Sequence, residues 1–186
     1  MNLSTHIRDI VNHILYEDLN AITLVGFSYG GFVITGALEH VADRVSHLVF
    51  LDAFVPANGE TVLAHIGRTG RTPAQLGEAL MVPPPDRQFD DPEEGNWITS
   101  RRTSHPLGCF TEPVYLAKPL EDFTFDRSYI KATQDPKSDV GADALWRAAD
   151  RARDSSAWRY AEIETTHMVA SNRPRELATI LLNGLA

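Results

Sequence analysis

A serine flanked by glycines is the clearest chemical signal in this 186-residue sequence. Residues 26–30 read Gly-Phe-Ser-Tyr-Gly, which is the pattern Gly-x-Ser-x-Gly with Ser28 at its centre. This pattern carries meaning when it follows a buried strand and opens a helix, because the sharp turn lifts the serine hydroxyl above the strand end. We therefore predict that Ser28 is a nucleophile and that the N–H of Tyr29 donates to a developing oxyanion.

The glycines around Ser28 have a steric explanation. Side chains beside the serine would clash in so sharp a turn, so Gly26 and Gly30 are expected to let the backbone pass closely. Gly31 is expected to ease the packing of the following helix on the sheet. The alternative interpretation is a glycine-rich turn that holds an idle serine.

A serine hydroxyl needs a general base, and the chain offers seven histidines. Six of them fall on predicted helices, inside a predicted strand or in a long central excursion: His6, His13, His40, His47, His65 and His105. His167 lies just beyond the last predicted strand, at the sheet edge where Ser28 also lies and where ligands gather in open α/β sheets. Folds that place a nucleophile on such a strand-to-helix turn have the chain order serine, acid, histidine, and His167 satisfies it. We therefore predict His167 as the base.

An acid must hold the imidazole in the correct tautomer. Asp135 follows the third predicted strand, which is the usual place for this acid, so it is the preferred candidate. Its alternative role is that of a turn residue before Pro136. Asp52, at the end of the second predicted strand, is the alternative acid, and Asp139 is a distant third.

The elements that must position these residues alternate between helices and apolar strands. Helices are predicted over residues 4–18, 30–41, 141–153 and 174–183, with Ser4 as the N-cap of the first. Strands are predicted over residues 21–27, 45–54, 128–134 and 158–164, the last being more polar and an edge. This alternation predicts an α/β fold with a mostly parallel sheet of about four strands, flanked by helices.

The middle of the chain has a different character. Seven of the eleven prolines lie between Pro83 and Pro119, which excludes a regular layer of sheet there. We predict a core over 1–55, an inserted cap over 56–125 that shapes a pocket, and a second core segment over 126–186. A helix or two is expected over residues 60–80. A mobile surface loop is the alternative to an ordered cap.

Composition excludes several partners. The net charge of −8 disfavours nucleic acid and anionic membrane surfaces. The N-terminus lacks the pattern of a signal peptide, and no apolar run approaches the length of a membrane span. The single cysteine, Cys109, fits a reducing, cytoplasmic location and is interpreted as a packed small residue.

The sequence also gives no cofactor signal. The histidines are scattered, no His-x-x-x-His or Cys-x-x-Cys spacing occurs, and there is no phosphate-binding loop. We therefore expect neither a metal nor a cofactor, with a small-molecule ester as the partner.

Five segments in family order resemble the α/β-hydrolase superfamily, and within it the branch of plant methyl-ester esterases, hydroxynitrile lyases and bacterial esterase relatives. The segments are residues 3–7, 24–31, 48–56, 129–135 and 166–168. The resemblance implies a serine esterase in which Asp135 matches the family's acid and His167 its histidine. The lyases carry Lys directly after that histidine, whereas this chain has Met168, as the esterases do.

The chain departs from this family in two places. Phe27 stands where relatives usually have His. The family's first strands are missing, together with a His-Gly loop that supplies the second oxyanion N–H, and losing one such donor costs about 2.7–4 kcal/mol. The predicted strand over 21–27 would then be an exposed edge, which is a liability in water.

Three interpretations of these departures are open. We favour a piece of a reading frame that begins upstream of Met1; the others are a truncated protein that dimerises through the edge over 21–27, and a complementing chain that pairs there. The expected function is hydrolysis of a small carboxylic ester through an acyl-enzyme. The alternatives are a non-catalytic ligand-binding protein of the hydrolase fold and an inactive truncated fragment.

Overall fold

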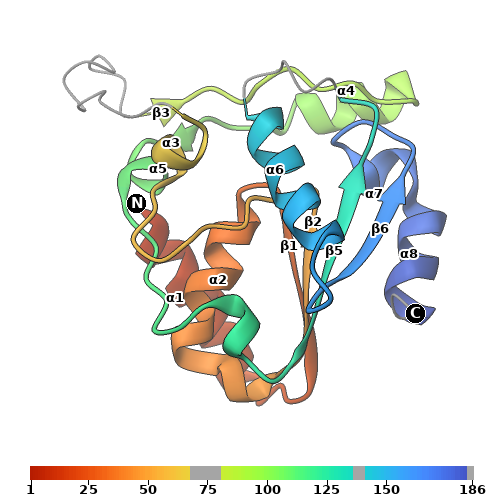
Figure 1. Ribbon diagram of the computed structural model, residues 1–186. Helices are drawn as coiled ribbons and strands as arrows, with labels where there is room; N and C mark the ends of the chain where they lie inside the picture. The colour runs from red at the N-terminus through yellow and green to blue at the C-terminus, as the bar shows by residue number, and fades with distance from the viewer. Residues whose placement is uncertain (68–80, 136–140, 184–186) are drawn as a thin grey trace.

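The fold is described by a computed structural model for residues 1–67, 81–135 and 141–183 (Figure 1). Its centre is a four-stranded parallel sheet in the order β1-β2-β5-β6. The strands are β1 Ile22–Phe27, β2 Val45–Leu51, β5 Asp126–Ala132 and β6 Arg159–Ile163. The predicted fold class is confirmed, and the polar strand β6 is an edge as expected, with β1 at the other edge.

The two central strands are apolar on both faces because helices cover both faces. Leu48 and Phe50 of β2 pack into the larger core cluster, whereas Val49 and Leu51 point to the opposite side and join a second cluster. This explains why the strand reads as a continuous apolar run rather than as an alternating one.

The helices form two layers around the sheet (Figure 1). Helices α1, α2 and α6 contribute to the larger cluster, with α1 packed against α2, and the short helix α7 and helix α8 contribute to the second. Their bounds are α1 Leu3–Tyr16, α2 Gly30–Val41, α6 Ala142–Arg153, α7 Val169–Asn172 and α8 Pro174–Asn183, with a 3₁₀ turn η1 at Ala42–Arg44.

The first helix begins earlier than predicted. Its N-cap is Asn2 rather than Ser4, and the Asn2 side chain accepts a hydrogen bond from the N–H of Thr5 at 3.2 Å. Thr5 in turn bonds back to the Asn2 backbone, which completes a capping box. The Ser4 hydroxyl instead donates to Glu112 at 2.6 Å and ties α1 to the segment between β2 and β5.

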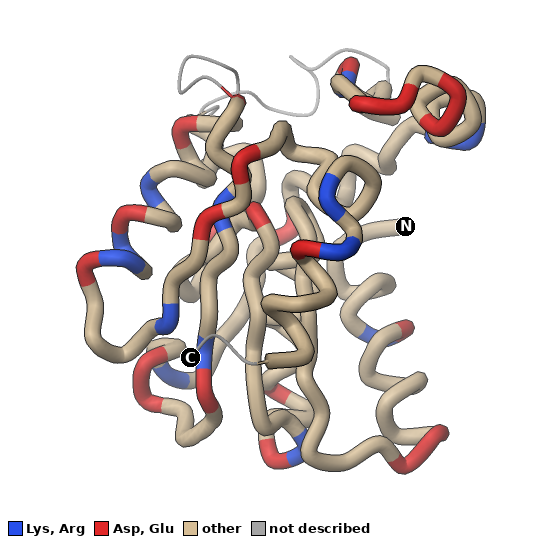
Figure 2. The backbone as a smooth tube through the Cα atoms, turned by 90° about the vertical axis from the view of Figure 1, so that its right-hand side faces the viewer, with Lys and Arg blue, Asp and Glu red and all other residues tan. Residues whose placement is uncertain are grey.

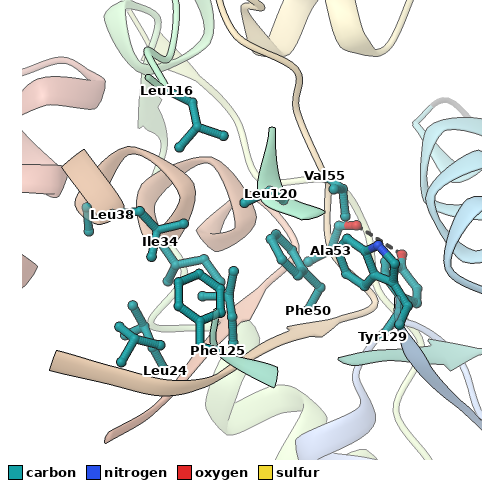
Figure 3. Close-up of a cluster of buried hydrophobic side chains, with 14 of the residues drawn as sticks. Leu24, Ile34, Leu38, Phe50, Ala53, Val55, Leu116, Leu120, Phe125 and Tyr129 are labelled. Carbon is teal, nitrogen blue, oxygen red and sulfur yellow. Dashed lines mark hydrogen bonds between the residues drawn. The ribbon is translucent and has the colours of Figure 1, made fainter. Parts of the chain in front are cut away.

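Aromatic and aliphatic side chains from sheet, helices and connecting loops meet in the larger core cluster (Figure 3). Leu24, Ile34, Phe50 and Phe125 belong to this cluster. Tyr129 of β5 is fully buried there, and its hydroxyl donates to the carbonyl oxygen of Ala53 at 2.9 Å. This bond anchors the backbone directly after Asp52, so the core fixes the place where β2 ends.

The described part of the segment between β2 and β5 that holds β3 and α4 lies across the carboxyl ends of the strands, and the chain after α5 then runs down beside α1 and α2 toward the start of β5 (Figure 1). The segment contains short elements: α3 Val62–His65, β3 Met81–Val82, α4 Pro92–Thr99, β4 His105–Pro106, α5 Gly108–Thr111 and the 3₁₀ turn η2 Leu120–Asp122. Strands β3 and β4 pair antiparallel. The helix expected within 60–80 is present as α3, while residues 68–80 lie outside the described residues.

The outer edge of β1 carries exposed apolar side chains. Val25 is 39% exposed and Phe27 is 38% exposed, on the sheet face opposite the one that Leu24 buries.

Among the helices of the described chain, none combines the length and apolar character needed to cross a lipid bilayer. In the view of Figure 2, acidic and basic segments are interspersed along the chain.

Candidate active site

Ser28 sits at a strained junction between β1 and α2. Its backbone φ is +56°, which places a residue with a side chain in the left-handed region. The turn is held by hydrogen bonds in which the Ser28 N–H donates to Leu51 at 3.3 Å and the Ser28 carbonyl accepts from Phe54 at 3.1 Å. A residue kept in this conformation by its surroundings is a common feature of functional sites.

The glycines near Ser28 differ in how much they matter. A Cβ on Gly26 would lie 2.7 Å from Ile34 Cδ1 and 2.9 Å from the Gly30 carbonyl oxygen, and one on Gly31 would lie 1.9 Å from the Phe54 carbonyl oxygen. A Cβ on Gly30 would meet nothing within 4 Å. The steric expectation therefore fits Gly26 and Gly31, and for Gly30 it is wrong within the described structure.

His167 reaches Ser28 from the loop after β6, the strand at the opposite edge of the sheet. It follows β6, is 3% exposed, and its Nε2 lies 2.9 Å from the Ser28 Oγ. The ring of Phe27 lies beside the imidazole with 4.6 Å between the ring centroids. The structure thus brings together the predicted nucleophile and the predicted base, although they are 139 positions apart in the sequence.

The acid beside the imidazole is Asp52 rather than Asp135. Oδ2 of Asp52 lies 2.6 Å from His167 Nδ1, in a side chain with no exposed surface. Oδ2 of Asp135 instead accepts a hydrogen bond from the backbone N–H of His167 at 2.9 Å. The preference for Asp135 as the partner of the ring is therefore corrected, and the alternative candidate occupies that position. Asp139 lies outside the described residues.

The order of the strands explains this correction. Strand β2 lies between β1, which carries Ser28 at its end, and β5, which precedes Asp135. The carboxyl end of β2 is therefore the strand end next to Ser28, and Asp52 stands there with a left-handed φ of +39°. Asp135 follows β5, which is one strand farther from Ser28. The Gln134 N–H donates to the Thr165 carbonyl at 2.9 Å, and this bond holds Asp135 beside the backbone of the loop that carries His167.

A buried lysine that sequence reasoning missed completes the surroundings of Asp52. Nζ of Lys131 lies 2.7 Å from Oδ1 of Asp52, is 1% exposed, and lies 4.4 Å from the centre of the Trp146 ring. The signal was present in the sequence, since a lysine inside the apolar strand 128–134 must be paired if that strand is buried.

The charge of Asp52 is set by opposing effects. Burial by itself raises the pKa of the Asp52 carboxyl, but the interaction with His167 and the nearby Lys131 ammonium outweigh burial. The net result is a pKa below the ordinary value of a carboxyl group. Asp52 is therefore an anion at neutral pH and accepts a hydrogen bond from Nδ1, which leaves the Nε2 lone pair facing Ser28.

A cleft of about 760 Å³ opens beside Ser28 and His167. Its walls come from the segment between β2 and β5 and from the loops at the strand ends, and include Phe54, Val62, Val82, Phe110 and Met168. Arg87 and Arg102 also line it. The cleft is of the size and apolar character usual for small-molecule sites.

Comparison with known proteins agrees with this fold. The model of the alpha/beta hydrolase family matches residues 2–180, and the chain belongs to that family. The carbendazim hydrolyzing esterase of Nocardioides sp. (strain SG-4G) is 34% identical over 131 residues, a match that covers 63% of this chain. The chain spans about half of the length of that esterase, 54%.

Solved structures share the fold at low sequence identity. An extracellular alpha/beta-hydrolase from a Paenibacillus species, described as homologous to tobacco salicylic acid binding protein 2, has a TM-score of 0.73 at 19% identity over 98% of this chain and 79% of that chain. A pyrethroid hydrolase from Sphingobium faniae JZ-2 has a TM-score of 0.66 at 18% identity over 100% of this chain and 78% of that chain. These likenesses support the α/β-hydrolase fold.

Proposed function

We propose that this chain is a serine esterase that hydrolyses a small carboxylic ester through an acyl-enzyme. The observation that carries the proposal is the continuous hydrogen-bonded line from Ser28 Oγ to His167 Nε2 at 2.9 Å and from His167 Nδ1 to Asp52 at 2.6 Å. A hydroxyl, an imidazole and a carboxylate in this order form the arrangement that activates a serine for acyl transfer.

In the first half of the proposed reaction, Ser28 Oγ attacks the ester carbonyl while His167 Nε2 takes the hydroxyl proton. Asp52 stabilises the imidazolium that forms. The negative charge on the former carbonyl oxygen is met by the N–H of Tyr29 at the start of α2. When the tetrahedral intermediate collapses, His167 gives its proton to the departing alkoxide and an alcohol leaves.

In the second half, a water molecule attacks the acyl group on Ser28. His167 takes a proton from this water and returns it to Ser28 Oγ as the carboxylic acid departs. One ester and one water thus become one acid and one alcohol, so the proposed reaction balances.

The cleft indicates the kind of ester. Its walls are mainly apolar and aromatic, which suits an uncharged organic group of modest size on either side of the carbonyl. Carbendazim belongs in the substrate panel, because the similar Nocardioides protein is named for hydrolysing it. A reducing, cytoplasmic location remains part of the proposal, supported by the buried free thiol of Cys109.

The edge of β1 is the proposed contact surface for another polypeptide segment, either from a second copy or from a complementing chain. Within the described sheet β1 pairs with β2 alone, and Val25 and Phe27 are exposed beside it. A Val25→Lys variant should have a lower mass by light scattering if copies associate there. A monomeric mass for the unchanged protein contradicts the second-copy form.

Hydrolysis of p-nitrophenyl acetate tests the proposed reaction. We expect turnover by the unchanged protein and a loss of at least about 10³-fold in Ser28→Ala, because the nucleophile is gone. Ser46→Ala is the matched control, since Ser46 is an exposed serine at the opposite end of the sheet. Turnover that survives in Ser28→Ala contradicts the proposal. Saturable binding of esters without turnover favours a ligand-binding protein instead.

A further inference from the structure

Three potential metal ligands from separate elements meet beside the cleft. His6 comes from α1, His105 from β4 and Cys109 from α5, and one ligand atom from each lies within 4.8 Å of the others. Cys109 Sγ lies 3.8 Å from His6 Nδ1. The hydroxyl of Tyr29, the residue next to Ser28, lies 3.1 Å from the same nitrogen.

Two imidazoles and one thiolate are a donor set that suits zinc. With Zn–N near 2.0–2.1 Å and Zn–S near 2.3 Å, a tetrahedral site separates its nitrogen and sulfur ligands by about 3.5 Å. The 3.8 Å between Cys109 Sγ and His6 Nδ1 is close to that separation. All three ligand atoms lie within 4.8 Å of one another, so side-chain rotation can bring them to the separations that a tetrahedral site requires.

His105 gives an independent reason to expect a ligand. Within the described chain its Nε2 is buried and has no hydrogen-bond partner. A buried polar nitrogen without a partner is costly, so structures usually satisfy it with a protein group, a water or an ion. His105 also lines the cleft, which provides an entry path for an ion.

We propose that His6, His105 and Cys109 bind one Zn²⁺ ion, with the fourth position taken by the Tyr29 hydroxyl or by water. This site differs from what the sequence predicts, because no metal-binding spacing exists along the chain. The ion joins α1 to the cap beside the residue that follows Ser28. The proposal does not depend on esterase activity, since binding can be measured without turnover.

Calorimetric titration with ZnCl₂ after treatment with chelator tests the site under reducing conditions. We expect one equivalent to bind, with affinity lowered at least tenfold in Cys109→Ser and in His6→Ala. His13→Ala is the matched control, because His13 is exposed on the same helix as His6. Circular dichroism confirms that each variant folds.

A second group, Asp52, Asp135 and His167, also brings three ligand atoms within 4.8 Å, so His167→Ala must be titrated in parallel. Binding that is lost in His167→Ala but kept in Cys109→Ser overturns the proposal, as does the absence of binding. Co²⁺ gives a readout that needs no variant, since coordination by Cys109 produces a thiolate-to-metal charge-transfer band in the unchanged protein. A Co²⁺ complex without that band contradicts the proposed ligands.

Discussion

Lys131 and Asp52 form a buried ion pair directly behind His167, with 2.7 Å between Nζ and Oδ1. Asp52 therefore has two tasks, since one carboxylate oxygen holds Lys131 and the other holds the imidazole at 2.6 Å. Removing either charge leaves the other group buried without its counter-ion, which is strongly destabilising. The core thus ties the orientation of the imidazole to a structural ion pair.

The rates of two matched amide variants separate the roles of the two aspartates. We expect Asp52→Asn to lower kcat by about 10⁴-fold, because the ring loses the anion that fixes its tautomer. Asp135→Asn should lower kcat by less than about tenfold, because an amide oxygen still accepts from the His167 backbone N–H. Ester hydrolysis by both purified variants measures the difference. The reverse ranking would return the role to Asp135.

The pH dependence of kcat/KM should reveal the influence of Lys131. The charge of Lys131 is one of the effects that hold the pKa of Asp52 below its ordinary value. In Lys131→Met that effect is lost, so the pKa of Asp52 rises and the carboxylate is protonated at a higher pH. We expect the acid limb of the profile to move to higher pH. Lys118→Met, at an exposed lysine, is the control, and an acid limb shared by all three proteins contradicts the assignment.

The stability of the same pair can be measured by a double-mutant cycle. Asp52→Asn should lower the free energy of unfolding by about 3–5 kcal/mol, because it leaves Lys131 buried and unpaired. Adding Lys131→Met should recover much of this loss, since no uncompensated charge remains. Urea unfolding of the four proteins gives the coupling free energy. Simple additivity of the two losses would show that the ion pair is not formed.

The sequence predicts much of this arrangement for identifiable reasons. The apolar run 45–54 predicts a strand because it is buried on both faces, and Ser28 and His167 are predictable because both follow strands and so reach one edge of the sheet. The choice between Asp52 and Asp135 depends on which strand end lies next to Ser28. That depends on strand order, which local patterns do not encode. The meeting of His6, His105 and Cys109 likewise depends on how the segment between β2 and β5 folds back on α1.

Two neighbouring glycines test the packing of the turn that carries Ser28. Gly31→Ala should lower the free energy of unfolding by about 3 kcal/mol or more, because its Cβ would lie 1.9 Å from a backbone oxygen. Gly30→Ala should change it by less than about 1 kcal/mol, since its Cβ meets nothing within 4 Å and alanine favours the helix. Thermal or urea unfolding compares the two. Equal losses would mean that the turn differs from the one described.

Covalent labelling by a serine-directed phosphonate, located by peptide mass spectrometry, tests most directly whether Ser28 is an activated nucleophile. The account predicts one adduct per chain, on the peptide that contains Ser28. The adduct should be absent in Ser28→Ala and should form far more slowly in Asp52→Asn. No adduct on folded protein, or an adduct on another serine that persists in Ser28→Ala, would contradict the account.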